Sequence, residues 1–183
     1  MRLAWSRPLG LLAAVLLVTG CAGHGAAAAG LPPRASPSAG QLRVGCGQVI
    51  LPANSGTVGG ARVVLGVLSV PPAHLPPAVP SGLRSWRYFR KWGLGVRAAS
   101  PAVVVSLPRA WQHLAAISWG NNVGIASSIR LLSCPRQAGA WNRYAGGFYL
   151  RSRSACVPLV FQVGRQSVTR NFGIGRNCGS PAA

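Results

Sequence analysis

The sequence predicts an all-β domain, and three observations support this prediction. From Leu42 onward, apolar and β-branched residues come in short runs that are separated by turn residues. No run in this region has the length and period of an amphipathic helix. Four cysteines follow, an even number that suits two disulfides. Together these features favour an immunoglobulin-like antiparallel β-sandwich with two disulfides, with a partly open β-barrel as the alternative.

Each expected strand is an apolar run between turn signals. The expected strands are Val44–Leu51, Arg62–Val70, Trp86–Ala98, Val103–Leu107, Ala115–Trp119, Ile125–Leu132, Gly147–Leu150, Val157–Val163 and Ser167–Ile174. Gly164-Arg165 stands between the last two and predicts a two-residue hairpin turn. The proline-rich segment 71–80 is expected to be an extended, exposed connection.

The N-terminal residues predict export and lipid anchoring. Arg2 and Arg7 precede an apolar run at 9–18, which is too short for an ordinary transmembrane helix. The run ends in Leu17-Val18-Thr19-Gly20-Cys21, which resembles the bacterial lipobox, the signal for acylating a cysteine and cutting just before it. A conventional signal peptide cut near Ala22 or Ala29, or an uncleaved anchor, is the alternative.

This interpretation divides the chain into four parts. Residues 1–20 are a lipoprotein signal peptide and residues 21–41, rich in Ala, Gly, Pro and Ser, are a lipid-anchored flexible linker. Residues 42–178 are the β-sandwich domain and residues 179–183 a C-terminal tail. The expected location is the extracytoplasmic face of the cell membrane.

The remaining cysteines are Cys46, Cys134, Cys156 and Cys178. Four cysteines allow three connectivities, of which we favour Cys46–Cys134 and Cys156–Cys178. The first bond would tie the first strand to the end of a middle one, and the second would close the C-terminal hairpin. No CxxC motif occurs, so a metal site is not expected.

The charge balance is extreme. The chain has 19 basic residues and no Asp or Glu, for a net charge of +19. Such a chain has no side-chain carboxylates for a glycosidase pair, an Asp-assisted catalytic triad or a Ca²⁺ loop. Uncompensated positive charge attracts polyanions, although a compositional bias toward arginine would give the same balance. We therefore expect that the protein is not an enzyme and holds no cofactor. Its expected partners are anionic lipid headgroups or wall polymers.

One stretch mixes cations and aromatic rings, and it is the candidate anion-binding site. Its residues are Arg84, Trp86, Arg87, Arg90, Lys91 and Trp92. The mixture suits a membrane interface, where aromatic rings and cations meet anionic headgroups. The plain alternative is a strand with core aromatics and outward-reaching arginines. Nucleic acid is not an expected partner.

Two further alternatives concern other side chains. Trp111, Trp119 and Trp141, with Asn121, Asn122 and Asn142, would serve a carbohydrate-binding module if they were exposed. His74 and His113 stand far apart in the sequence and do not indicate a metal site. An enzyme would need a cleft that brings His113 to a serine or a free cysteine.

Five segments carry a resemblance to other proteins. They are Trp86-Arg-Tyr-Phe-Arg-Lys, Ile117-Ser-Trp-Gly, Trp141-Asn-Arg-Tyr-Ala-Gly-Gly-Phe-Tyr-Leu, Ala155-Cys-Val-Pro-Leu and Phe172-Gly-Ile-Gly-Arg-Asn-Cys178. With them the domain resembles secreted or lipid-anchored proteins of high-GC actinobacteria that have no assigned activity. The resemblance therefore implies an exported domain and no particular chemistry.

Overall fold

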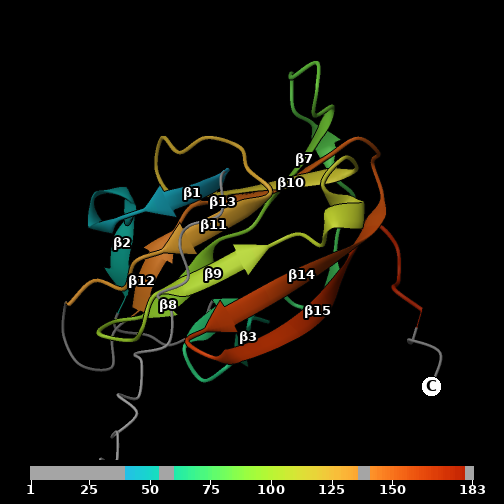
Figure 1. Cartoon of the computed structure of the whole chain (residues 1–183). Helices are drawn as coiled ribbons and strands as arrows, with labels where there is room; N and C mark the ends of the chain where they lie inside the picture. The colour runs from blue at the N-terminus through green and yellow to red at the C-terminus, as the bar shows by residue number, and fades with distance from the viewer. Residues whose placement is uncertain (1–39, 54–59, 136–140, 180–183) are drawn as a thin grey trace, which may run out of the picture. The chain divides into compact units, whose positions relative to one another are not determined.

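The computed structural model describes residues 40–53, 60–135 and 141–179, shown in colour in Figure 1. The chain divides into the units Met1–Ser36 and Pro37–Ala183, and all described residues belong to the second. The predicted signal peptide, the lipobox cysteine Cys21 and nearly all of the predicted linker lie outside the described residues.

The described chain is all-β, as predicted, and its longest sheet has six strands. The order is β1 (Gln41–Val44), β11 (Ser128–Leu131), β9 (Val103–Ser106), β14 (Ala155–Val163), β15 (Gln166–Ile174) and β5 (His74–Leu75). The inner pairs are antiparallel, while β1 and β5 run parallel to their neighbours at the two edges. The predicted hairpin is confirmed, because Gly164 adopts φ +57° between the long strands β14 and β15 (Figure 1).

The other two sheets are antiparallel. One has five strands in the order β2 (Leu51–Ala53), β12 (Trp141–Tyr144), β8 (Leu94–Arg97), β4 (Leu68–Val70) and β3 (Arg62–Val64). The other has four, in the order β10 (Ala115–Trp119), β13 (Gly146–Leu150), β7 (Tyr88–Lys91) and β6 (Val79–Pro80). Two short 3₁₀ turns, η1 (Cys46–Gln48) and η2 (Arg109–Trp111), complete the structure.

These two smaller sheets share two chain segments. The strands β7 and β8 follow one another with only Trp92 and Gly93 between them, and β12 and β13 are separated by Ala145 alone. The N–H of Trp92 donates to the carbonyl of Gly146 at 2.8 Å, which carries the pairing across the break. The two sheets therefore form one bent layer opposite the six-stranded sheet.

A continuous hydrophobic core joins the strands of all three sheets. Phe148 of the bent layer lies 5.7 Å from Phe172 of the six-stranded sheet, measured between ring centres, and 5.6 Å from Trp119. The indole N–H of the fully buried Trp119 donates to the Trp92 carbonyl at 2.9 Å, so this large ring leaves no polar atom unpaired.

The disulfides join Cys46 to Cys134 and Cys156 to Cys178, the pairs favoured from the sequence. The first connects η1 to the segment after β11, across 88 positions of sequence. The second ties the start of β14 to the loop after β15, across 22 positions. Each is expected to stabilise the fold by about 2–4 kcal/mol by restricting the unfolded chain.

Several strand boundaries were predicted wrongly. The predicted strand Val44–Leu51 is interrupted by η1, which contains Cys46 of the first disulfide. The predicted strand Arg62–Val70 is a tight hairpin, because Leu65 and Gly66 both adopt positive φ. The proline-rich segment is not merely an exposed connection: it supplies β5 and β6 and buries Leu75 and Ala78 in the core.

Candidate functional site

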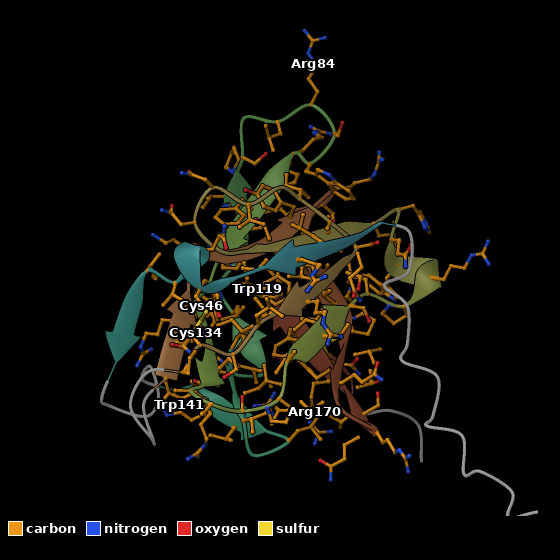
Figure 2. The ribbon with its side chains drawn as sticks, turned by 60° about the vertical axis from the view of Figure 1, so that its left-hand side comes forward. Cys46, Arg84, Trp119, Cys134, Trp141 and Arg170 are labelled. Carbon is orange, nitrogen blue, oxygen red and sulfur yellow. A yellow bond between two sulfur atoms is a disulfide. The ribbon has the colours of Figure 1, made fainter. Side chains whose placement is uncertain are left out.

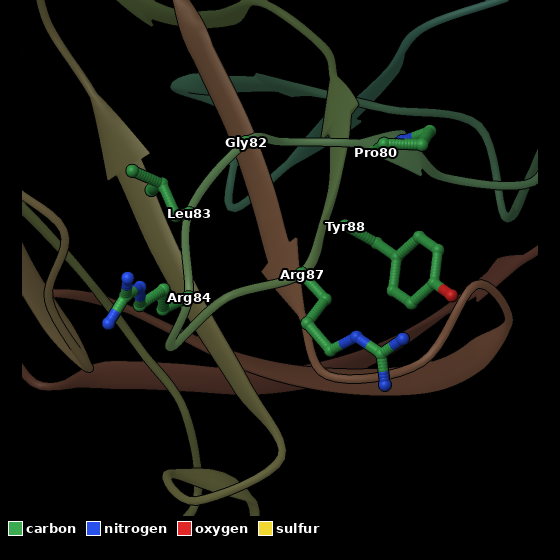
Figure 3. Close-up of a pocket in the computed structure, with 6 residues that line it drawn as sticks. All are labelled: Pro80, Gly82, Leu83, Arg84, Arg87 and Tyr88. Carbon is green, nitrogen blue, oxygen red and sulfur yellow. The ribbon is translucent and has the colours of Figure 1, made fainter.

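The candidate site is the loop between β6 and β7, where the cationic and aromatic residues begin. A hollow of about 480 Å³ opens there. Its lining residues are Pro80, Gly82, Leu83, Arg84, Arg87 and Tyr88 (Figure 3). Arg84 and Arg87 are exposed, and Figure 2 shows Arg84 projecting from the tip of this loop.

Hydrogen bonds close the loop on itself. The Ser81 N–H donates to the Arg87 carbonyl at 2.9 Å, and the Ser81 hydroxyl donates to the Trp86 carbonyl while accepting the Leu83 N–H at 3.0 Å. Gly82 takes φ +78°, a conformation that side chains disfavour. This bonding pattern fixes the path of the backbone between the two arginines.

Two cations at the site lie over aromatic rings. The Arg87 guanidinium is 5.8 Å from the centre of the Tyr88 ring, and Figure 3 shows it extending beside that ring. The Arg151 guanidinium lies 5.5 Å from the centre of the Trp86 ring. Cation–π contacts of this kind hold a guanidinium in place without neutralising its charge.

Arg151 was not predicted as part of the site. It follows β13, far from Trp86 in the sequence, and only the pairing of β13 with β7 brings the two segments together. A single arginine after an apolar strand carries no sequence signal that would have identified it.

The other predicted residues do not join Arg84 and Arg87. Arg90 is half-buried, and its guanidinium donates to the Pro77 carbonyl, while its Nε has no hydrogen-bond partner among the described residues. Trp92 packs against the core, and Lys91 is exposed on the strand. These positions match the plain alternative of a strand with core-packed aromatics and reaching cations.

The strand β7 alternates between two faces. Arg90 stands opposite the buried Phe148, and Phe89 stands opposite Tyr149. The rings of Phe89 and Tyr149 are 4.6 Å apart and half-buried on the other face of the sheet. The exposed Lys91 lies on this same outer face of β7, whereas the exposed Arg84 and Arg87 lie in the loop.

The residues of the carbohydrate alternative are dispersed. Trp119 and Trp141 are 0% and 4% exposed, so neither ring can stack on a sugar. Asn142 is buried and donates to the Cys134 carbonyl at 3.2 Å. Asn121 and Asn122 are exposed in the turn after β10.

The structure also places the remaining candidates. His74 and His113 are exposed, and the four cysteines of the domain are all held in disulfides. Within residues 40–53, 60–135 and 141–179, no three potential metal ligands gather. Over the same ranges, no helix is long and apolar enough to cross a membrane.

One buried group has an altered acidity. Burial raises the pKa of Tyr144 to about 12. Its hydroxyl donates to the Leu132 carbonyl at 2.7 Å and lies 3.9 Å from the sulfur of Cys134. Tyr144 therefore belongs to the core beside the first disulfide and not to the cationic loop.

The fold and the loop define a disulfide-bonded all-β domain that presents unneutralised arginines. In comparisons with known proteins, no family model, curated protein or solved structure matches this chain. The assignment of function therefore rests on the chain's own chemistry.

Proposed function

We propose that this protein is a non-enzymatic, lipid-anchored binding module of the cell envelope. In this proposal Cys21 carries the lipid and the arginine-bearing loop between β6 and β7 contacts the anionic headgroups of the membrane surface. The 20 residues between Cys21 and Leu42 would span at most about 70 Å, so the domain would remain within reach of that surface.

The observation that carries the proposal is the loop with Arg84 and Arg87. Both side chains are exposed at a projecting loop, and the chain has no Asp or Glu that could pair with them. Their charge is available to an external anion, and nearby rings suit the interfacial region of a bilayer. Each basic residue near an anionic surface contributes about 1 kcal/mol of attraction.

The anchor is tested by the intact mass of the protein from the membrane fraction, reduced and non-reduced, with thiol alkylation. We expect a diacyl or triacyl mass on a chain that begins at Cys21, with the other four cysteines protected. An unacylated chain would refute the anchor.

The surface contact is tested with the full chain carrying Cys21→Ala, which cannot be acylated. Its binding to vesicles of phosphatidylcholine with phosphatidylglycerol is compared with binding to phosphatidylcholine alone. Replacing Arg84 and Arg87 with Gln should weaken anionic binding by roughly 30-fold, from about 1 kcal/mol for each cation.

The matched control replaces Arg165 and Arg170 with Gln, which removes the same charge. Both are exposed, and Figure 2 shows Arg170 at the opposite end of the ribbon from Arg84. The control should bind nearly as the parent does. Equal losses in the two double variants would mean that net charge alone, and not the loop, drives binding. Full inhibition by a soluble wall polymer at low concentration would instead favour such polymers as the partner.

A further inference from the structure

A second hollow, of about 410 Å³, lies where β14 begins. The apolar part of its lining includes Trp111, which is half-buried, and Leu114, which is 42% exposed. The polar part is made by Arg151, Arg176, Ser152 and Ser154. An apolar wall with a few convergent polar groups is the usual composition of a small-ligand site.

The backbone around this hollow is fixed by hydrogen bonds. The Leu114 N–H donates to the Trp111 carbonyl at 3.0 Å, and the Arg151 N–H donates to the Leu114 carbonyl at 3.2 Å. The first bond closes the turn after η2, and the second joins this turn to the segment after β13. The backbone that carries the apolar wall is therefore tied to the backbone of Arg151.

The segment with Arg176 is held by other means. The Cys156–Cys178 disulfide fastens the chain two residues beyond it. Gly173 packs so closely that a Cβ there would lie 2.2 Å from the Arg176 carbonyl oxygen. The hollow is thus built from three separate chain segments that are anchored before any ligand arrives, which lowers the cost of binding.

The charge of the hollow is not balanced inside the protein. The Arg151 guanidinium lies over the Trp86 ring, which leaves its charge in place, and Arg176 is exposed. Neither can meet an Asp or Glu of its own chain, because the sequence has none. Guanidinium groups recognise carboxylate and phosphate oxygens through charge-assisted hydrogen bonds.

We infer that this hollow binds a small amphipathic oxyanion, with its carboxylate or phosphate group at Arg151 and Arg176 and its apolar body against Trp111 and Leu114. The Ser154 hydroxyl can donate a further hydrogen bond to the head group, whereas the Ser152 hydroxyl already donates to the Ser154 carbonyl at 2.8 Å. The hollow does not use Arg84 or Arg87, the residues of the proposed membrane contact, and it touches that loop only through the contact of Arg151 with Trp86.

The test uses the full chain carrying Cys21→Ala and octyl phosphate as the probe. Titration followed by ¹H–¹⁵N NMR should show saturable shifts of the Trp111 indole and of the backbone amides at 151–156 and 176. Inorganic phosphate, which lacks the apolar body, and octyl glucoside, which lacks the charge, should each bind at least about tenfold more weakly.

The variant Arg176→Gln should weaken octyl phosphate binding about tenfold, as expected for the loss of one charge-assisted hydrogen bond. Arg170→Gln removes the same charge from the exposed face of β15 and should change the affinity less than twofold. Leu114→Ala, at an exposed position, should weaken octyl phosphate but leave inorganic phosphate unchanged.

Three outcomes would overturn the inference: no saturable binding, shifts scattered over the surface, or equal losses in Arg176→Gln and Arg170→Gln. The two proposals fail separately. Replacing Arg84 and Arg87 should leave octyl phosphate binding intact, and Arg176→Gln should leave vesicle binding nearly intact.

Discussion

The buried hydroxyl of Tyr144 makes stability depend on pH in the alkaline range. Tyr144→Phe removes this hydroxyl while keeping the ring, and it deprives the Leu132 carbonyl of a donor at 2.7 Å. The side chain is 0% exposed, so water cannot replace the bond without a shift of the core. We expect the variant to be less stable than the parent by about 1–2 kcal/mol at pH 7.

The difference in the free energy of unfolding between the parent and Tyr144→Phe should shrink as the pH rises. The pKa of Tyr144 is raised from 10.0 to about 12 by burial, so the folded state favours the neutral phenol. The stability that the fold gains from this neutral phenol is complete below about pH 10 and is lost as the pH rises towards the pKa of Tyr144 in the folded state. It falls by roughly 1.4 kcal/mol by pH 11. Tyr144→Phe has no such group and should lack this loss.

Urea unfolding of both proteins, followed by circular dichroism at several pH values from 8 to 11, measures the effect. Titration of the other tyrosines occurs in both chains and cancels in the difference between their free energies of unfolding. A difference that stays constant from pH 8 to pH 11 would refute the argument from burial.

Three further predictions concern stability. Lowering the pH from 7 to about 2 should change the free energy of unfolding by less than about 1 kcal/mol, because no side-chain carboxylate has to be protonated; a steep loss seen by circular dichroism would contradict this. Gly147→Ala should lower the free energy of unfolding, measured with urea, by about 3 kcal/mol or more, because the new Cβ would lie 2.0 Å from the Arg90 carbonyl oxygen. The control Gly124→Ala, whose Cβ would meet no atom within 4 Å, should have little effect. Replacing Cys156 and Cys178 together with Ala should cost about 3 kcal/mol, read as a lower midpoint of thermal unfolding, and an unchanged midpoint would show that the bond adds nothing.

The fold class could be predicted because local signals agreed with tertiary structure. Strands such as Val103–Ser106 and Ala115–Trp119 are short apolar runs between turns, and each runs through the core. The strand Trp141–Tyr144 was missed because it lacks β-branched residues and exists through its pairing with Leu94–Arg97. Pairing between distant segments is not visible in a single short run.

The candidate site was predictable only in part. The loop with Arg84 and Arg87 stands out in the sequence as a mixture of cations and rings. The alternation of side chains along a strand does not predict the hydrogen bond from Arg90 to the Pro77 carbonyl. That bond depends on the packing of the proline-rich segment, which the sequence did not predict. The contact of Arg151 with Trp86 depends on sheet pairing and has no local signature.

The position of the Cys46–Cys134 disulfide has a mechanical consequence. The chain enters the six-stranded sheet through β1, a four-residue edge strand that pairs with β11 alone. Tension applied from the N-terminal side would first load this short strand and could peel it away. Two residues after β1, the load would reach Cys46 and pass through a covalent bond to Cys134. Tension from the N-terminal side would therefore release this edge strand before it loads the disulfide.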